Sequence, residues 1–224
     1  VVRNPAFAGE ELERARAEAL DNLQVALSTP GSISGFAMTR ALYGETPYGG
    51  IASPATLAAI STEGMGEFHR TYWRPDNAVL VITGDVSAEE GFAIAQRHFG
   101  DWAAPADPLP PRADANDWAP GVRTIVVDLP DTGQAAVAMG LRGVARTDAD
   151  YFPLLVANNV LGGGYSARLN TEIRIRRGLS YGAGSSLSAR AAPGPIIASA
   201  QTRNDAAVQV YELMSAEIAR IGAE

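Results

Sequence analysis

An arginine and a tyrosine seven residues apart are the residues of this chain whose types and spacing best suit chemistry. Arg174 and Tyr181 flank Gly178 in the stretch LNTEIRIRRGLSYGAGSSL. If the segment before Gly178 is helical and the glycine reverses the chain, the two side chains can converge. A guanidinium fork and a phenol suit the holding of a peptide carbonyl, or of the oxyanion of a tetrahedral intermediate. The residues alone favour a plainer alternative, a solvated arginine and a tyrosine packed on a sheet face.

Three consecutive glycines precede this stretch, Gly162, Gly163 and Gly164 in LGGGYSARLN. Glycines before a helix can present backbone N–H groups to an anion. The same pattern is typical of a helix C-cap followed by a connector. Glycine content alone favours the second interpretation.

A zinc site of a known kind cannot be assembled from this sequence. The two histidines, His69 and His98, have no second histidine or paired carboxylates at ligand spacing, so neither H-E-x-x-H nor H-x-x-E-H is present. There is no cysteine, which excludes disulfides and thiolate ligands. The sequence therefore predicts no metal ligand in this chain.

Composition and charge narrow the possible partners. The chain is 46% hydrophobic, which is ordinary for a globular protein, and its net charge is -7. Phosphate-backbone binding needs a basic face, so we expect no nucleic-acid partner. No apolar run approaches the ~20 residues of a membrane span, so we expect none. The chain begins with neither a methionine nor a signal-peptide pattern, which suggests a piece of something longer.

Helical periodicity and capping residues dominate the first half of the chain. Ser87 and Glu90 are spaced as a capping box, and Gly100 follows the last turn. A continuous apolar run over Ala78 to Ile82 predicts a buried strand. Other helices are expected over 10–27, where Pro30 and Gly31 end the pattern, and over 34–42. Two more are expected, one that begins near Ser53 and one that runs from Ser61 or Thr62 to before Pro75.

A proline-rich stretch over 105–120 reads as a linker, and beyond it sheet and helix patterns alternate again. The last helix is expected over 204–222, with Asn204 as its N-cap. Strands are predicted over 122–130, 133–143, 179–190 and 194–202, and helices over 148–164 and 166–178. Together, the predicted helices and strands indicate an α+β architecture.

Two long segments resemble the pitrilysin/insulinase family of zinc metallopeptidases, the inverzincins. They are FHRTYWRPDNAVLVITGDVSAEEGFAIAQRHFGDW and NNVLGGGYSARLNTEIRIRRGLSYG. The resemblance implies a metallopeptidase fold of the pitrilysin/processing-peptidase type, with sheets flanked by helices in two similar domains. We expect both domains to be incomplete: 1–104 as the C-terminal part of the first, 105–120 as the linker, and 121–224 as the N-terminal part of the second.

The resemblance also implies roles for particular residues. The family's arginine and tyrosine, which contact the substrate across the zinc, fall on Arg174 and Tyr181. Its glycine-rich loop near the substrate chamber falls on Gly162, Gly163 and Gly164. The family's third zinc ligand is a glutamate, and that position carries Asn22, whose neutral amide is a poor zinc ligand.

These correspondences predict a non-catalytic, substrate-binding subunit of a two-chain zinc peptidase. Its partner would be a zinc-bearing catalytic subunit of the same family, its substrate a peptide, and its own cofactor none. The resemblance to the family and the alanine-rich composition suggest a bacterial protein, and they favour the periplasm as its compartment. Two alternatives stay open: a fragment of a single-chain zinc protease whose metal motif lies upstream, and a structural scaffold without peptidase activity.

Overall fold

The computed structural model describes residues 2–112, 121 and 123–223 of the 224-residue chain. These form two compact units. Unit 1 consists of residues 1–21 and 53–112, and unit 2 of residues 22–52 and 113–224. Of the linker expected over 105–120, residues 113–120 lie outside the described part.

The regular elements in the described part of unit 1 are all helices, and local capping explains where two of them begin. The Ser61 hydroxyl accepts the N–H of Gly64 at 3.1 Å. Ser87 and Glu90 form the predicted capping box, in which the Ser87 N–H donates to the Glu90 carboxylate at 2.9 Å. The helices are α1 (Gly9–Leu27), which continues into unit 2, α3 (Pro54–Ala58), α4 (Thr62–Tyr72), η2 (Pro75–Asn77) and α5 (Ala88–Phe99).

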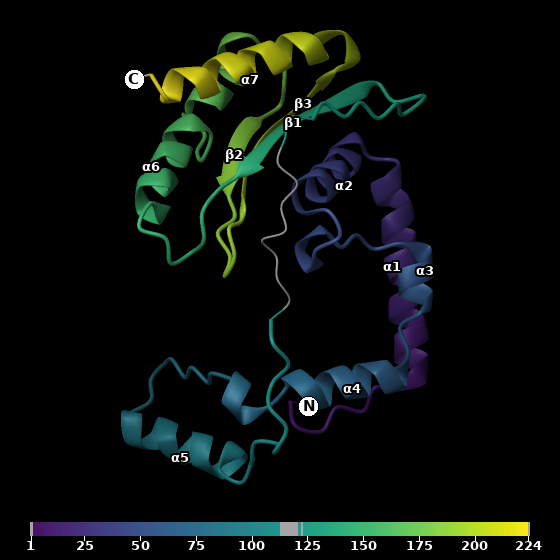
Figure 1. Ribbon diagram of the computed structural model, residues 1–224, viewed down its shortest axis with the longest axis vertical. Coiled ribbons are helices and arrows are strands. Elements are labelled where there is room, and N and C mark those ends of the chain that lie inside the picture. The colour runs from purple at the N-terminus through teal and green to yellow at the C-terminus, as the bar shows by residue number, and fades with distance from the viewer. Residues whose placement is uncertain (1, 113–120, 122, 224) are drawn as a thin grey trace. The chain divides into compact units, whose positions relative to one another are not determined.

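Unit 2 is built on a three-stranded antiparallel sheet with the order β1-β3-β2 (Figure 1). Its strands are β1 (Gln134–Arg142), β2 (Ala183–Leu187) and β3 (Pro195–Arg203). Its helices are α2 (Pro30–Tyr43), η1 (Pro47–Gly49), α6 (Tyr151–Leu161), the π-helix η3 (Asn170–Arg176), η4 (Asn204–Ala206) and α7 (Ala207–Ile221).

Helices cover both faces of this sheet. On the face of α6 and α7, Leu169, Ile173, Val210 and Met214 are fully buried and form the centre of the hydrophobic core. On the opposite face lies α2 (Figure 1). A Cβ added to Gly140 of β1 would lie 2.4 Å from the sulfur of Met38, so the strand and α2 approach closely there. The predicted α+β class is confirmed.

Two predicted strands are wrong. The run over Ala78 to Ile82 and the described part of 122–130 are not paired with any strand among the described residues. Val79 is 90% exposed and Val126 is 87% exposed. Both segments have the apolar pattern of a strand, but a strand forms only where a second strand takes up its backbone hydrogen bonds.

Two helix starts also differ from the prediction. The first helix ends at Leu27 as predicted, but the helix expected from Ser34 starts four residues earlier, at Pro30. Pro30 occupies the first turn of α2, where its fixed φ is favourable and its missing N–H costs nothing. Asn204 does not cap the last helix, because it begins η4 and its side-chain amide donates to the Thr132 carbonyl at 2.7 Å. The last α-helix starts three residues later, at Ala207.

Candidate functional site

Arg174 lies on η3, the π-helical segment between the glycine-rich loop and β2. Ile173 beside it is fully buried in the core and fixes the helix against the sheet. Gly178 has a φ of +64°, a conformation that glycine adopts without strain, and it reverses the chain after the helix. The predicted helix and glycine turn are thus confirmed, whereas the strand predicted over 179–190 forms only over Ala183–Leu187, so Tyr181 lies just before it. π-Helical turns are frequent at functional sites.

The three arginines of this segment have different surroundings. Glu172 accepts ion pairs from Arg176 at 3.0 Å and from Arg177 at 2.7 Å. These hydrogen bonds, first from Arg177 and then from Arg176, lower the pKa of Glu172. The guanidinium of Arg174 instead lies over the ring of Tyr165, 5.1 Å from its centroid. Within the described residues Arg174 has no carboxylate partner, so its positive charge is not neutralised.

Tyr181 has an exposed side chain on a firmly held backbone. The segment between Gly178 and Tyr181 is held by the buried Thr202, whose hydroxyl donates to the Leu179 carbonyl at 2.6 Å. The Ser180 hydroxyl donates to the Gly182 carbonyl at 2.6 Å and accepts that residue's N–H at 3.0 Å. Tyr181 itself is 90% exposed. A large aromatic side chain therefore projects into solvent from a hydrogen-bonded turn.

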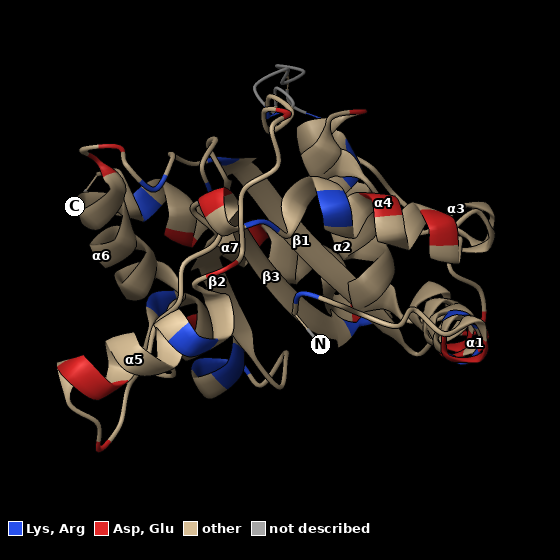
Figure 2. Cartoon of the chain, turned by 90° about the horizontal axis from the view of Figure 1, so that it is seen from below, with Lys and Arg blue, Asp and Glu red and all other residues tan. Residues whose placement is uncertain are grey.

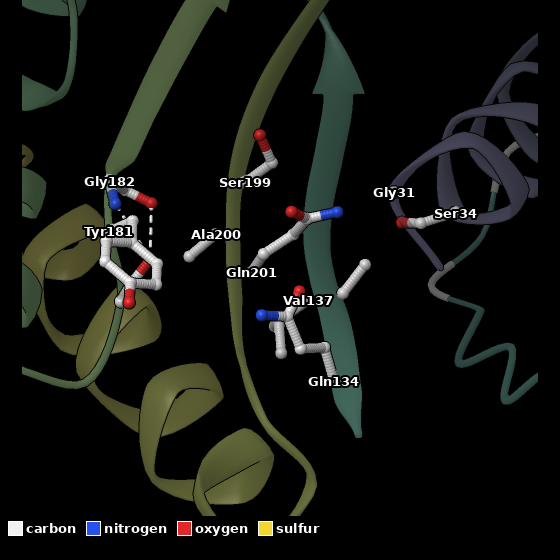
Figure 3. Close-up of a pocket in the computed structure, with 11 residues that line it drawn as sticks. Gly31, Ser34, Gln134, Val137, Tyr181, Gly182, Ser199, Ala200 and Gln201 are labelled. Carbon is white, nitrogen blue, oxygen red and sulfur yellow. Dashed lines mark hydrogen bonds between the residues drawn. The ribbon is translucent and has the colours of Figure 1, made fainter. Parts of the chain in front are cut away.

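A hollow of about 350 Å³ lies beside Tyr181 on the α2 side of the sheet. Figure 3 shows Tyr181 at one side of it and Ser34 of α2 at the other, with β3 and β1 between them. Gln134 and Gln201 contribute side-chain amides, and no charged residue lines the hollow among those described. The surroundings suit a neutral, hydrogen-bonding group such as a peptide amide.

Arg174 and Tyr181 are carried by consecutive elements, but they do not contact each other. In the described part of the chain no hydrogen bond or ring contact joins them, and Arg174 instead contacts Tyr165. Both remain candidates for contact with a ligand. Their role in binding is an expectation from the resemblance and stays a prediction.

The three loop glycines differ in their surroundings. A Cβ on Gly162 would lie 2.2 Å from the backbone nitrogen of Ser185, so packing against β2 requires glycine there. A Cβ on Gly163 would lie 2.4 Å from the side-chain oxygen of Asn159. Gly164 has open space where its Cβ would be. The first two glycines thus have a packing role in addition to any contact with substrate, which stays a prediction.

No zinc site fits the residues that the structure describes. It brings together no group of three or more His, Cys, Asp or Glu side chains that could hold a metal ion there. The His69 ring is half-buried between Phe7 and Trp73, and its Nε2 lies 2.8 Å from the Val2 carbonyl oxygen. Asn22 lies exposed on α1. Among the described helices, none is both long and apolar enough to cross a membrane.

Sequence reasoning missed two residues that shape the site. Tyr165 stacks under the Arg174 guanidinium. Asn170 is buried, its amide donates to the Tyr165 carbonyl at 2.6 Å, and its side-chain oxygen accepts the Ala183 N–H at 3.3 Å. One side chain thus ties the loop before η3 to the strand after Tyr181. The only available signal was an asparagine inside a helix, a place where its side chain usually needs a specific partner.

Unit 2 is thus a mixed helix-and-sheet unit whose candidate site residues lie on a π-helix and the following turn. Residues 59–224 match the family described as Peptidase M16 inactive domain. The chain belongs to this family, and the resemblance to pitrilysin-type peptidases is confirmed.

Relatives agree with this assignment. The chain is 26% identical over 226 residues to an uncharacterized zinc protease of Mycobacterium leprae, covering 100% of this chain and 51% of the relative. Its structure is similar to the crystal structure of a peptidase M16 inactive domain from Pseudomonas fluorescens, with a TM-score of 0.87, 27% identity and coverage of 98% of this chain and 53% of that one. Pitrilysin shares the fold, with a TM-score of 0.60, 15% identity and coverage of 98% and 25%. The chain spans about half the length of the first two proteins.

Proposed function

We propose that this chain is the non-catalytic, substrate-binding part of a two-chain zinc peptidase, and that Arg174 and Tyr181 contact the peptide opposite a zinc ion on the partner. The observation that carries the proposal is the state of Tyr181. It is 90% exposed although hydrogen bonds hold the residues on either side of it. Exposed aromatic side chains on a rigid support are typical of binding sites.

The electrostatics of Arg174 support the same proposal. Its two neighbouring arginines are paired with Glu172, whereas its own guanidinium lies only against an aromatic face in the described structure. A guanidinium stacked on a ring keeps its N–H edge available. We propose that this edge donates to a carbonyl of the bound peptide.

The chemistry assigned to this chain is binding and charge stabilisation. Arg174 and Tyr181 both donate hydrogen bonds, so they can share the negative charge that develops on a carbonyl oxygen during peptide hydrolysis. The neutral hollow beside Tyr181 accommodates an adjacent amide of the peptide. We propose that the zinc belongs to the partner, a catalytic member of the same family; the described residues of this chain bring together no group that could hold it.

Peptide hydrolysis tests this assignment. The full-length protein is assayed alone and mixed with a zinc-bearing family member encoded beside its gene, with Arg174→Ala and Tyr181→Phe as variants. We expect activity only in the mixture, and a loss of about 10²-fold in kcat/KM for Tyr181→Phe, as for removal of one oxyanion donor. Tyr211→Phe is the matched control, because Tyr211 is exposed on α7.

The other outcomes separate the alternatives. Zinc-dependent hydrolysis by this protein alone would mean that it is part of a single-chain protease. No hydrolysis in any mixture would favour a structural scaffold. If the Arg174→Ala and Tyr181→Phe variants are as active as the wild type, neither residue takes part in the proposed site.

A further inference from the structure

The ring of Tyr165 is exposed, whereas its backbone is fixed to η3. Tyr165 is 68% exposed. The N–H of Ala167 donates to the Gly164 carbonyl at 3.1 Å and closes a turn around Tyr165. The side-chain amide of the buried Asn170 donates to the Tyr165 carbonyl at 2.6 Å. Because Asn170 is the first residue of η3, the Tyr165 side chain leaves the backbone at a fixed point beside that helix.

This ring covers the guanidinium of Arg174. The Arg174 guanidinium carbon lies 5.1 Å from the Tyr165 ring centroid. The negative face of an aromatic ring attracts a cation at this distance. Such a stack uses only the face of the planar guanidinium, so the N–H donors at its edge stay available for another partner.

The carboxylate nearest to Arg174 along the chain is already paired. Glu172 accepts ion pairs from Arg176 and Arg177. The helix α6, which leads into the turn of Tyr165, carries no charged residue, as Figure 2 shows. Within the described residues, the Tyr165 ring is thus the partner that remains for the Arg174 guanidinium.

A partner of this kind affects how easily Arg174 can bind a ligand. A free arginine side chain samples many rotamers, and ordering it when a peptide binds costs affinity. A ring that already holds the guanidinium reduces that cost. The tyrosine itself needs little ordering, because its side chain has few rotatable bonds and its backbone is held by Asn170.

We propose that Tyr165 is a positioning residue for Arg174: its ring holds the guanidinium by its face, so that the N–H edge meets the carbonyl of a bound peptide. This role rests on the proposed contact between Arg174 and the peptide. It belongs to the ring of Tyr165 and not to its hydroxyl, because a stack uses the face of the ring. Since the ring is exposed, its removal should leave the fold intact.

The first measurement concerns the free protein and does not depend on peptide hydrolysis. Full-length protein with isotope-labelled arginine is observed by NMR, and the signals of Arg174 are identified by their loss in Arg174→Lys. The ring current of Tyr165 should shift these signals. We therefore expect them to move in Tyr165→Leu and to keep their wild-type positions in Tyr165→Phe. Thermal unfolding shows whether each variant is folded.

The second measurement is peptide hydrolysis by this protein mixed with the zinc-bearing family member. We expect Tyr165→Leu to lower kcat/KM about two- to fivefold, the factor that corresponds to a cation–π contact of about 0.5–1 kcal/mol. Tyr165→Phe keeps the ring and should retain most of the activity. In the Arg174→Ala background, Tyr165→Leu should have no further effect, because a residue that acts through Arg174 needs Arg174 to be present. Tyr211→Leu, which removes an exposed ring from α7, is the matched control.

The outcomes separate this role from the proposed function. Unchanged Arg174 signals in folded Tyr165→Leu would show that the ring does not hold the guanidinium, and would overturn the proposal. Wild-type activity of that variant would overturn it too, as would an equal loss in the Arg174→Ala background. If the wild-type mixture hydrolyses no peptide although the Arg174 signals move, the proposed function fails and so does the positioning role, while the contact between ring and guanidinium stands.

Discussion

Replacement of Gly162 by alanine should destabilise unit 2, whereas the same replacement two residues later should not. The added methyl group at Gly162 would lie 2.2 Å from the Ser185 backbone nitrogen and 2.7 Å from the Gly184 carbonyl carbon. These are backbone atoms of β2, so they cannot move aside cheaply. The Gly162 carbonyl also accepts the Ser185 N–H at 3.0 Å, and a retreat of the loop would break that hydrogen bond.

The magnitude follows from these two effects. Overpacking by one methyl group costs about 1–3 kcal/mol, and the hydrogen bond contributes about 1 kcal/mol, so we expect a loss of about 2–4 kcal/mol. Urea denaturation of Gly162→Ala, followed by circular dichroism, measures the free energy of unfolding. Gly164→Ala is the matched control, because its added methyl group meets nothing within 4 Å. If the two variants unfold at the same urea concentration, the packing argument for the glycine loop is wrong.

Two further predictions concern the elements around Tyr181. Asn170→Ala removes both side-chain bonds that join the Tyr165 carbonyl to the Ala183 N–H, so we expect a loss of about 2–3 kcal/mol in urea denaturation; a loss below 0.5 kcal/mol would show that water replaces both bonds. The ion pairs from Arg177 and Arg176 lower the pKa of Glu172 from its ordinary value of 4.5, so their stabilisation is present above that value and is lost as the pH falls through the lower, folded value. Glu172→Gln should therefore reduce the dependence of unfolding free energy on pH below 4.5, and an unchanged profile would contradict this assignment.

Features set by neighbouring residues could be predicted from the sequence. The capping box of Ser87 and Glu90 is confirmed because both partners lie within one helical turn. The turn at Gly178 is confirmed for the same reason, since a positive φ after a helix is a local demand for glycine.

Features set by distant residues could not be predicted. The run over Ala78 to Ile82 has the composition of a strand, but pairing depends on a second strand elsewhere in the protein. The contacts of Arg174 depend on the fold of the loop before η3, which brings Tyr165 under its guanidinium. The bridge made by Asn170 joins a loop to a strand, and no spacing in the sequence indicates it.

Site-specific photo-crosslinking tests the central claim most directly. The variant Tyr181→p-benzoylphenylalanine is mixed with the zinc-bearing partner and a labelled peptide, and irradiated, with Tyr211→p-benzoylphenylalanine on α7 as the control. We expect the labelled peptide to become attached to this chain from position 181 and not from position 211. Attachment from neither position, in a mixture that still hydrolyses the peptide, would show that Tyr181 does not contact the substrate.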